Sequence, residues 1–141
     1  MKAVRNDYLA LPADEESSYT IKFVFKDEDG NAAAPVTMVY TLMAEDGEVI
    51  NSRYKVNVGV LAATTYITLY GDDLQLIDKK SVYENRVLTV EGTYNSTYGN
   101  GLPFIRQIFF RVRNVILVAI ALSISTADVV YTNDYVEDVS A

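Results

Sequence analysis

The residues able to do chemistry in this chain are carboxylates and tyrosines, because its 141 residues contain no histidine and no cysteine. Their absence excludes imidazole acid–base catalysis, thiolate nucleophiles, disulfides and His- or Cys-based metal sites. Most of the aromatic residues are tyrosines, 11 against 5 phenylalanines and no tryptophan. Any active site or metal site would therefore have to be built from acidic side chains.

Two acidic stretches have some of the character of cation sites, and we interpret both as structural. The sequence DEDGN at 27–31 is similar to the start of an EF-hand loop, but its glycine is the fourth residue instead of the sixth, and no glutamate stands at the twelfth position. Asp72 and Asp73, beside Gly71, could bind a surface cation with Asp78, but acids at a strand end are usually solvated. We predict a turn at 27–31 and no metal site.

Glu84 and Glu91 could form the carboxylate pair of a glycosidase, but we expect them in different elements, and the chain has no tryptophan on which a sugar could stack. The sequence YGNGLP at 98–103 lacks the lysine and Ser/Thr of a phosphate loop. We therefore predict that the chain is not an enzyme and uses no cofactor.

The loop from Tyr94 to Asn100 is the candidate ligand site. Tyrosine and asparagine side chains make adaptable contacts, and this loop carries Tyr94, Asn95, Tyr98 and Asn100. The alternative interpretation is that the tyrosines cap the end of a hydrophobic core.

The elements that would position these groups are short β-strands. In the stretch at 18–26 apolar residues recur at every second position, which is the period of a strand with one buried face. Seven such strands at roughly ten-residue spacing, without a long helix, are typical of an all-β, Greek-key β-sandwich. We predict strands at 18–26, 36–43, 54–60, 64–70, 86–94 and 104–112, a short strand after the Asp46–Gly47 turn, and a connection at 71–85.

The uncharged run from Asn114 to Ala127 raises the question of a membrane span. As a helix its 14 residues would extend about 21 Å, short of the roughly 30 Å hydrocarbon core, so we expect none. Bulky and small residues alternate from Val118 onward, which predicts a strand. It could complete a sheet of its own domain or pair with a partner subunit; a helix or interfacial segment is the remaining alternative. The bulky face comprises Val118, Ile120, Leu122 and Ile124, and the small face Ala119, Ala121, Ser123 and Ser125.

The formal charge of −7 argues against nucleic acid as a partner. Arg106, Arg111 and Arg113 are the only charged residues between Gly101 and Ala127. They could mark a contact face or be solvated positions at a strand edge. We predict a partner-binding surface made of Arg111, Arg113, Val118, Ile120, Leu122, Ile124, Tyr131 and Tyr135, the last two in the C-terminal tail.

Four turn and strand motifs lie between Tyr19 and Asn114. They are a D-x-D-G turn before a proline-led strand, a D-G-x-V-I hairpin, an R-x-L-x-V-x-G-x-Y strand and a closing F-x-V-x-N strand. Together they resemble the immunoglobulin-like domains of structural proteins from tailed bacteriophages. The resemblance implies a non-enzymatic virion protein, either a capsid decoration or cement protein or an accessory subunit of the neck or tail. The implied partners are copies of itself and other virion proteins, such as the major capsid protein or neck and tail subunits.

The expected organisation is an N-terminal extended segment at 1–17, an immunoglobulin-like sandwich at 18–114, and an extra strand with a C-terminal arm at 115–141. No apolar stretch of signal-peptide length begins the chain, so we expect no export signal. The arm extends past the point where such a domain would close, which favours a subunit that grips a neighbour by adding a strand to an exposed sheet edge. The alternative function is a carbohydrate- or host-surface-binding module that uses the Tyr94–Asn100 loop.

Overall fold

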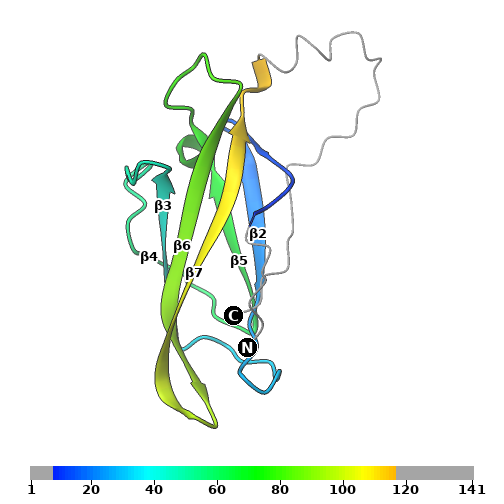
Figure 1. Ribbon diagram of the computed structural model, residues 1–141, viewed down its shortest axis with the longest axis vertical. Coiled ribbons are helices and arrows are strands. Elements are labelled where there is room, and N and C mark those ends of the chain that lie inside the picture. The colour runs from blue at the N-terminus through cyan, green and yellow to red at the C-terminus, as the bar shows by residue number, and fades with distance from the viewer. Residues whose placement is uncertain (1–7, 117–141) are drawn as a thin grey trace, which may run out of the picture.

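The computed structural model describes residues 8–116, which form seven β-strands and one short 3₁₀-helix (Figure 1). Five strands make a large sheet in the order β1-β7-β6-β3-β4, and β2 and β5 make a small sheet that lies behind it in Figure 1. The all-β prediction is confirmed. In this part of the chain no helix has the length and hydropathy needed to cross a membrane. The elements are β1 (Ala13–Asp14), β2 (Ser18–Val24), β3 (Thr37–Ala44), β4 (Val56–Asn57), β5 (Thr64–Tyr70), η1 (Gly71–Leu74), β6 (Tyr83–Ser96) and β7 (Gly99–Arg113).

The core lies between the two sheets and is made by alternate residues of the strands. In β2 and β5 every second side chain is buried, as the two-residue period predicts. The rings of Tyr19 in β2 and Phe110 in β7 stack with their centroids 5.2 Å apart, so β2 packs across from β7. Burying each such side chain stabilises the fold by about 1.5–3 kcal/mol.

The β6–β7 hairpin is longer than the sequence predicts. Its strands have 14 and 15 residues and pair from Tyr83↔Arg113 to Ser96↔Gly99, and its tip extends beyond the rest of the sandwich in Figure 1. Strand pairing continues into the stretch expected to form a loop, through Tyr94↔Leu102 and Ser96↔Gly99, with a bulge between these two pairs. At the bulge Gly101 has a positive φ of 67°, and its amide donates to the side chain of Asn95 at 2.8 Å. The residues that favour turns are therefore found at the tip of one long hairpin.

Two of the predicted strands are much reduced. The Asp46–Gly47 turn forms, but the segment after it makes only an isolated bridge, Met43↔Val49. The strand predicted at 54–60 shrinks to the two residues of β4. The reason is local: Asn51, Ser52 and Lys55 all have positive φ, which breaks the extended conformation that the alternating pattern assumes.

The first described residues belong to the sandwich. β1 pairs in parallel with the end of β7, and Leu9 and Ala13 are buried in the core. Arg113 joins this pairing through its guanidinium, because Nη2 and Nε both lie 2.7 Å from Oδ1 of Asp14. Part of the segment expected to be an N-terminal extension is thus a strand of the large sheet.

Candidate binding site beside the β6–β7 hairpin

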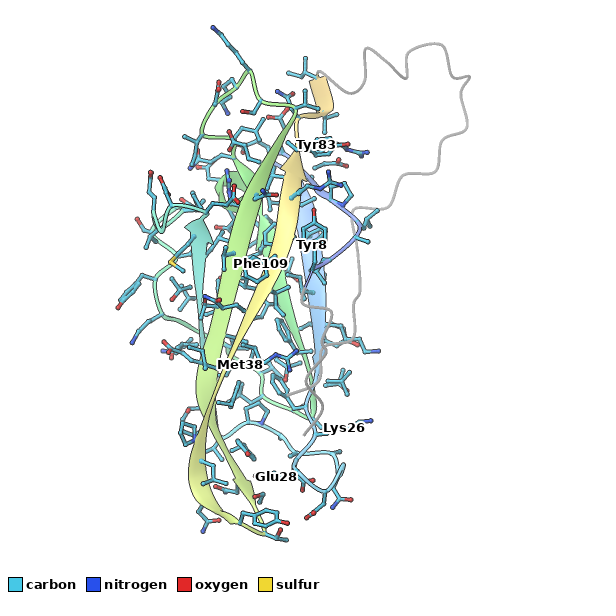
Figure 2. All side chains as sticks on the ribbon, in the orientation of Figure 1. Tyr8, Lys26, Glu28, Met38, Tyr83 and Phe109 are labelled. Carbon is cyan, nitrogen blue, oxygen red and sulfur yellow. The ribbon has the colours of Figure 1, made fainter. Side chains whose placement is uncertain are left out.

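A pocket of about 520 Å³ lies where the distal half of the β6–β7 hairpin faces the 27–31 turn. It has the size and the mixed lining of a small-ligand or side-chain site. Figure 2 shows Lys26 and Glu28 near the lower end of the molecule, beside the distal part of the hairpin. The lining residues are Phe25, Lys26, Asp27, Glu28, Ala33, Pro35, Tyr94, Pro103 and Phe104.

The wall of the pocket is aromatic. Phe104 lies between the two other rings, with its centroid 5.4 Å from that of Phe25 and 6.3 Å from that of Tyr94. Tilted and edge-on contacts of this kind are the favoured geometries of aromatic pairs. Phe25 is buried, whereas Phe104 and Tyr94 are half-buried, so the last two rings are those that a ligand could reach.

The rim of the pocket is fixed by a hydrogen bond between hairpin and turn. Tyr94 Oη donates to Oε2 of Glu28 at 2.8 Å. A hydrogen bond from its own backbone amide, followed by the one from Tyr94, lowers the pKa of Glu28, and the bond to Glu28 raises the pKa of Tyr94. At neutral pH the pair is therefore a phenol donating to a charged carboxylate.

The 27–31 turn itself is confirmed. Oδ1 of Asp27 accepts from the amides of Asp29 at 3.0 Å and Asn31 at 2.9 Å, and Gly30 has a φ of 83°. This oxygen caps the turn in the manner typical of aspartate. Among residues 8–116 no cluster of three or more acidic side chains could hold a metal ion.

The structure places the residues of the predicted ligand loop in different environments. Tyr94 lines the pocket, but Asn95 uses its side-chain oxygen to accept from Gly101, and Tyr98 stands 69 % exposed at the tip. Asn100 is exposed there as well. Sequence reasoning missed Phe25, Phe104 and Glu28 as site residues, because the turn and the hairpin are some 66 positions apart and no local pattern links them.

The arginines of β7 have different environments. Arg113 is held by Asp14, as described above, and Arg111 lies over the ring of Tyr83 with 4.3 Å between Cζ and the centroid. Arg106 is 7 % exposed, so it is neither a solvated position nor part of an exposed contact face, because the even-numbered residues of β7 from Leu102 onward face inward. The other predicted partner-binding residues lie outside the described residues: Val118, Ile120, Leu122, Ile124, Tyr131 and Tyr135.

Glu84 and Glu91 do not form a glycosidase pair. Both lie in β6, contrary to the expectation of different elements, and seven positions along a strand separate them by about 23 Å and place them on opposite faces. Glycosidase carboxylates are about 5–9.5 Å apart. Glu84 accepts from Arg86 at 2.7 Å and from the amides of Ile77 and Asp78, each at 2.8 Å, so it stabilises the fold.

Asp73 is likewise structural. Its side chain is fully buried and accepts from Arg53 Nε at 2.7 Å, Asn51 Nδ2 at 2.9 Å and the Tyr70 amide at 3.2 Å. These bonds join η1 to the positive-φ bend that replaces the predicted strand. Asp72 is exposed, and the two acids do not act as a pair.

Comparisons of the chain with protein-family models, with curated proteins and with solved structures find no match.

Proposed function

We propose that this chain is a non-enzymatic structural subunit of a tailed-phage virion, built on an immunoglobulin-like sandwich and assembled through its C-terminal segment. The observation that carries the proposal is the strand order. In immunoglobulin variable-type domains one sheet is formed by strands C′, C, F and G, and strands B and E are neighbours in the other. The orders β4-β3-β6-β7 and β2-β5 are the same arrangement in the same chain sequence.

The motif R-x-L-x-V-x-G-x-Y supports the resemblance in a second way. Its residues occupy alternate positions of β6 and therefore share the inner face of the strand. Leu88 and Val90 are core residues, Arg86 is buried, Gly92 allows β3 to approach closely, and Tyr94 lines the pocket. Each position of the motif thus has a structural role.

The polar groups of the described residues favour a structural protein over an enzyme. Asp14, Asp73 and Glu84 are each paired with an arginine. Each of these carboxylates accepts a hydrogen bond from its arginine and is thereby fixed in place within the fold. The proposed partners are copies of the chain and neighbouring virion proteins, such as the major capsid protein or neck and tail subunits.

The expected result of a test is that assembly depends on the bulky face of the predicted C-terminal strand. The full chain with Ile120 and Leu122 both replaced by glutamate should lose self-association, because two buried carboxylates would have no partners. Light scattering after size exclusion would measure the mass, which should fall from an oligomer to the 15.7 kDa monomer.

The matched control replaces Ala119 and Ala121 with serine, which keeps the pattern and adds no charge. This control should remain oligomeric at the same protein concentration. A monomeric wild-type chain, or a glutamate variant as large as the wild type, would refute assembly through this segment.

The second candidate function is a carbohydrate-binding module, favoured by the aromatic pocket and by the exposed Tyr98 at the hairpin tip. In that case Tyr98→Ala should weaken glycan binding by roughly two- to tenfold, since stacking on one aromatic ring contributes about 0.5–1.5 kcal/mol. Binding on a glycan array and by calorimetry would measure this. Unchanged binding, or none by the wild type, would count against the module; oligomeric mass should stay the same in either case.

A further inference from the structure

Within residues 8–116, the outer edge of β5 pairs with no other strand along its seven residues. The amide of Phe25 donates to Ala63 at 2.7 Å, and the amide of Gly71 donates to Ser17 at 2.9 Å, so odd-numbered residues of β5 point their backbone groups toward β2. The even-numbered residues therefore point theirs to the opposite side. Within residues 8–116 only one of these groups is hydrogen-bonded, the Tyr70 amide, which donates to Asp73. The open groups are the N–H and C=O of Thr64, Tyr66 and Thr68 and the C=O of Tyr70.

This edge lacks the features by which proteins protect open strands. Such edges usually carry a lysine, a proline or a bulge, or are very short. The sequence TTYITLY has no charge, no proline and no glycine, and its exposed side chains include Tyr66 and Tyr70, which are 56 % and 59 % exposed. An uncovered edge of this composition would promote aggregation. It therefore requires an occupant.

The two other long edges are less suited to receiving a strand. The outer edge of β2 carries Lys22, the type of residue that discourages pairing. The free edge of β7 is interrupted because Pro103 has no N–H, and Leu9 and Glu15 donate to the carbonyls of Phe109 and Arg113. Among the described strands, the edge of β5 is therefore the one best suited to receive a strand, although β2 has the same length of seven residues.

We propose that residues 118–125 of a second copy pair with the outer edge of β5. This inference rests on the proposed function and identifies where the assembling segment binds. The segment has eight residues for an edge of seven, and neither strand carries a charge, so pairing buries no unpaired ion. Each backbone group that is open on β5 would gain a hydrogen bond.

The side chains on both faces also agree with this pairing. The small residues at 119, 121, 123 and 125 would lie beside Tyr66 and Tyr70, leaving room for the two rings. The bulky residues at 118, 120, 122 and 124 would face the core side, where Val56, Val58 and Leu61 are only partly buried. Those three residues precede β5 in sequence, in and after β4. The bulky face would extend the apolar core at this flank.

The place where the chain leaves the sandwich favours a second copy over the same chain. β2 packs across from β7 through Tyr19 and Phe110. A strand added outside β5 would therefore be displaced from β7 by one spacing between sheets and, at right angles to it, by two spacings between strands. The resulting distance is roughly 14 Å. Asn114 is anchored to the carbonyls of Val82 and Lys79. Residues 115–116 are helical, so the four steps along the chain from Asn114 to Val118 extend only about 10 Å, which is too short to bring residue 118 of the same copy to this edge.

A cross-linking experiment tests the pairing directly, because the chain has no cysteine of its own. Full-length Thr68→Cys and full-length Ala121→Cys are mixed in equal amounts and oxidised mildly, and disulfide heterodimers are quantified on non-reducing gels and by mass spectrometry. The experiment is repeated with cysteine at 119 and at 123 to cover neighbouring registers. At the best register we expect at least tenfold more heterodimer than in a control that pairs Gln107→Cys with Ala121→Cys. Equal or higher yield at Gln107 would overturn the assignment of the edge.

The double variant Thr68→Cys/Ala121→Cys, oxidised at high dilution, identifies the donor. Intrachain disulfides in the double variant without heterodimers from the mixed single variants would show that the edge is covered by its own chain, and the inference would be wrong. Light scattering of the same samples separates the two proposals. An oligomer that gives no cross-link at Thr68 contradicts only the inference, whereas a monomer without cross-links contradicts self-assembly as well.

A backbone variant supplies an independent test. Thr68→Pro removes an N–H that faces the open side and leaves the pairing with β2 intact. We expect its oligomer to dissociate at a protein concentration at least tenfold higher than the wild type. The matched control is Thr68→Ala, which also loses the 2.9 Å contact with the Thr20 hydroxyl but keeps the amide, and it should assemble like the wild type. Equal assembly of both variants would overturn the pairing; if Thr68→Pro does not fold, the cross-linking result decides.

Discussion

Replacement of Gly92 by alanine is expected to lower the free energy of unfolding by about 3 kcal/mol. A Cβ at this position would overlap the backbone carbonyl oxygen of Thr37 on the adjacent strand β3. Because the obstacle is backbone in a paired strand, β3 and β6 would have to separate locally, and the Met38↔Gly92 register would be lost. Urea denaturation of the full chain at one fixed concentration would measure the change.

The matched control for this experiment is Gly59→Ala. No heavy atom lies within 4 Å of a Cβ built on Gly59, and its φ is not positive, so we expect a change within about 0.5 kcal/mol. Similar losses in the two variants would mean that the close approach of β3 to Gly92 has no special role.

Replacement of Arg86 by methionine should destabilise the chain by about 3–5 kcal/mol at pH 7. The Arg86 side chain is 2 % exposed and its Nη2 lies 2.7 Å from Oε1 of Glu84, which is itself 12 % exposed. The same nitrogen donates to the carbonyl of Gln75 at 2.9 Å. The variant would leave a nearly buried carboxylate without a counter-ion and a carbonyl without its donor. Adding Glu84→Gln to the variant should recover part of the loss, because no charge then stays buried.

The pH dependence of the Arg86→Met effect has a definite sign. Burial acts to raise the pKa of Glu84, but the hydrogen bonds from Arg86 and from the amides of Asp78 and Ile77 outweigh it and leave the pKa below its ordinary value. A carboxyl with a lowered folded-state pKa stabilises the fold above its unfolded pKa, about 4.3, and loses this contribution as the pH falls through the folded value. The difference in unfolding free energy between wild type and variant should therefore hold from pH 7 to about pH 4.3 and shrink as the pH falls further. A constant difference would contradict the role of the ion pair.

The parts of the fold that the sequence predicts well are those in which one face of a strand is buried along its full length. In β2 and β5 alternation alone identifies the buried side chains, because a shift of one residue would expose all of them. The stretch 54–60 alternates equally well, yet Tyr54 is 62 % and Val60 81 % exposed. Its conformation depends on the bend at Asn51 and on Asp73, which is 22 positions further along the chain, and local periodicity carries no information about such a contact.

The candidate site shows the same limit. The sequence predicts Tyr94 as a site residue because it lies in a polar aromatic loop. Its partner Glu28 lies in a turn, and its other partner Phe104 lies in a strand. At these two positions the local sequence predicts only turn formation and core packing. The pocket exists because the hairpin continues past the sandwich far enough to meet the turn. That length is set by strand pairing, although the glycine, asparagine and proline residues of this stretch favour a loop.

The parallel pairing of β1 with β7 has a consequence for how the chain folds during synthesis. Asp14 and Arg113 are 99 positions apart, so of the strands in residues 8–116 β1 is made first and its partner β7 last. β2 must likewise wait for β5, whereas β6 and β7 are joined by a tight turn and can pair as soon as both have left the ribosome. Local contacts form faster than distant ones, so the hairpin is the natural starting point of folding. Leu9 and Ala13 stay exposed until β7 has emerged, which is the period of greatest risk of misassembly.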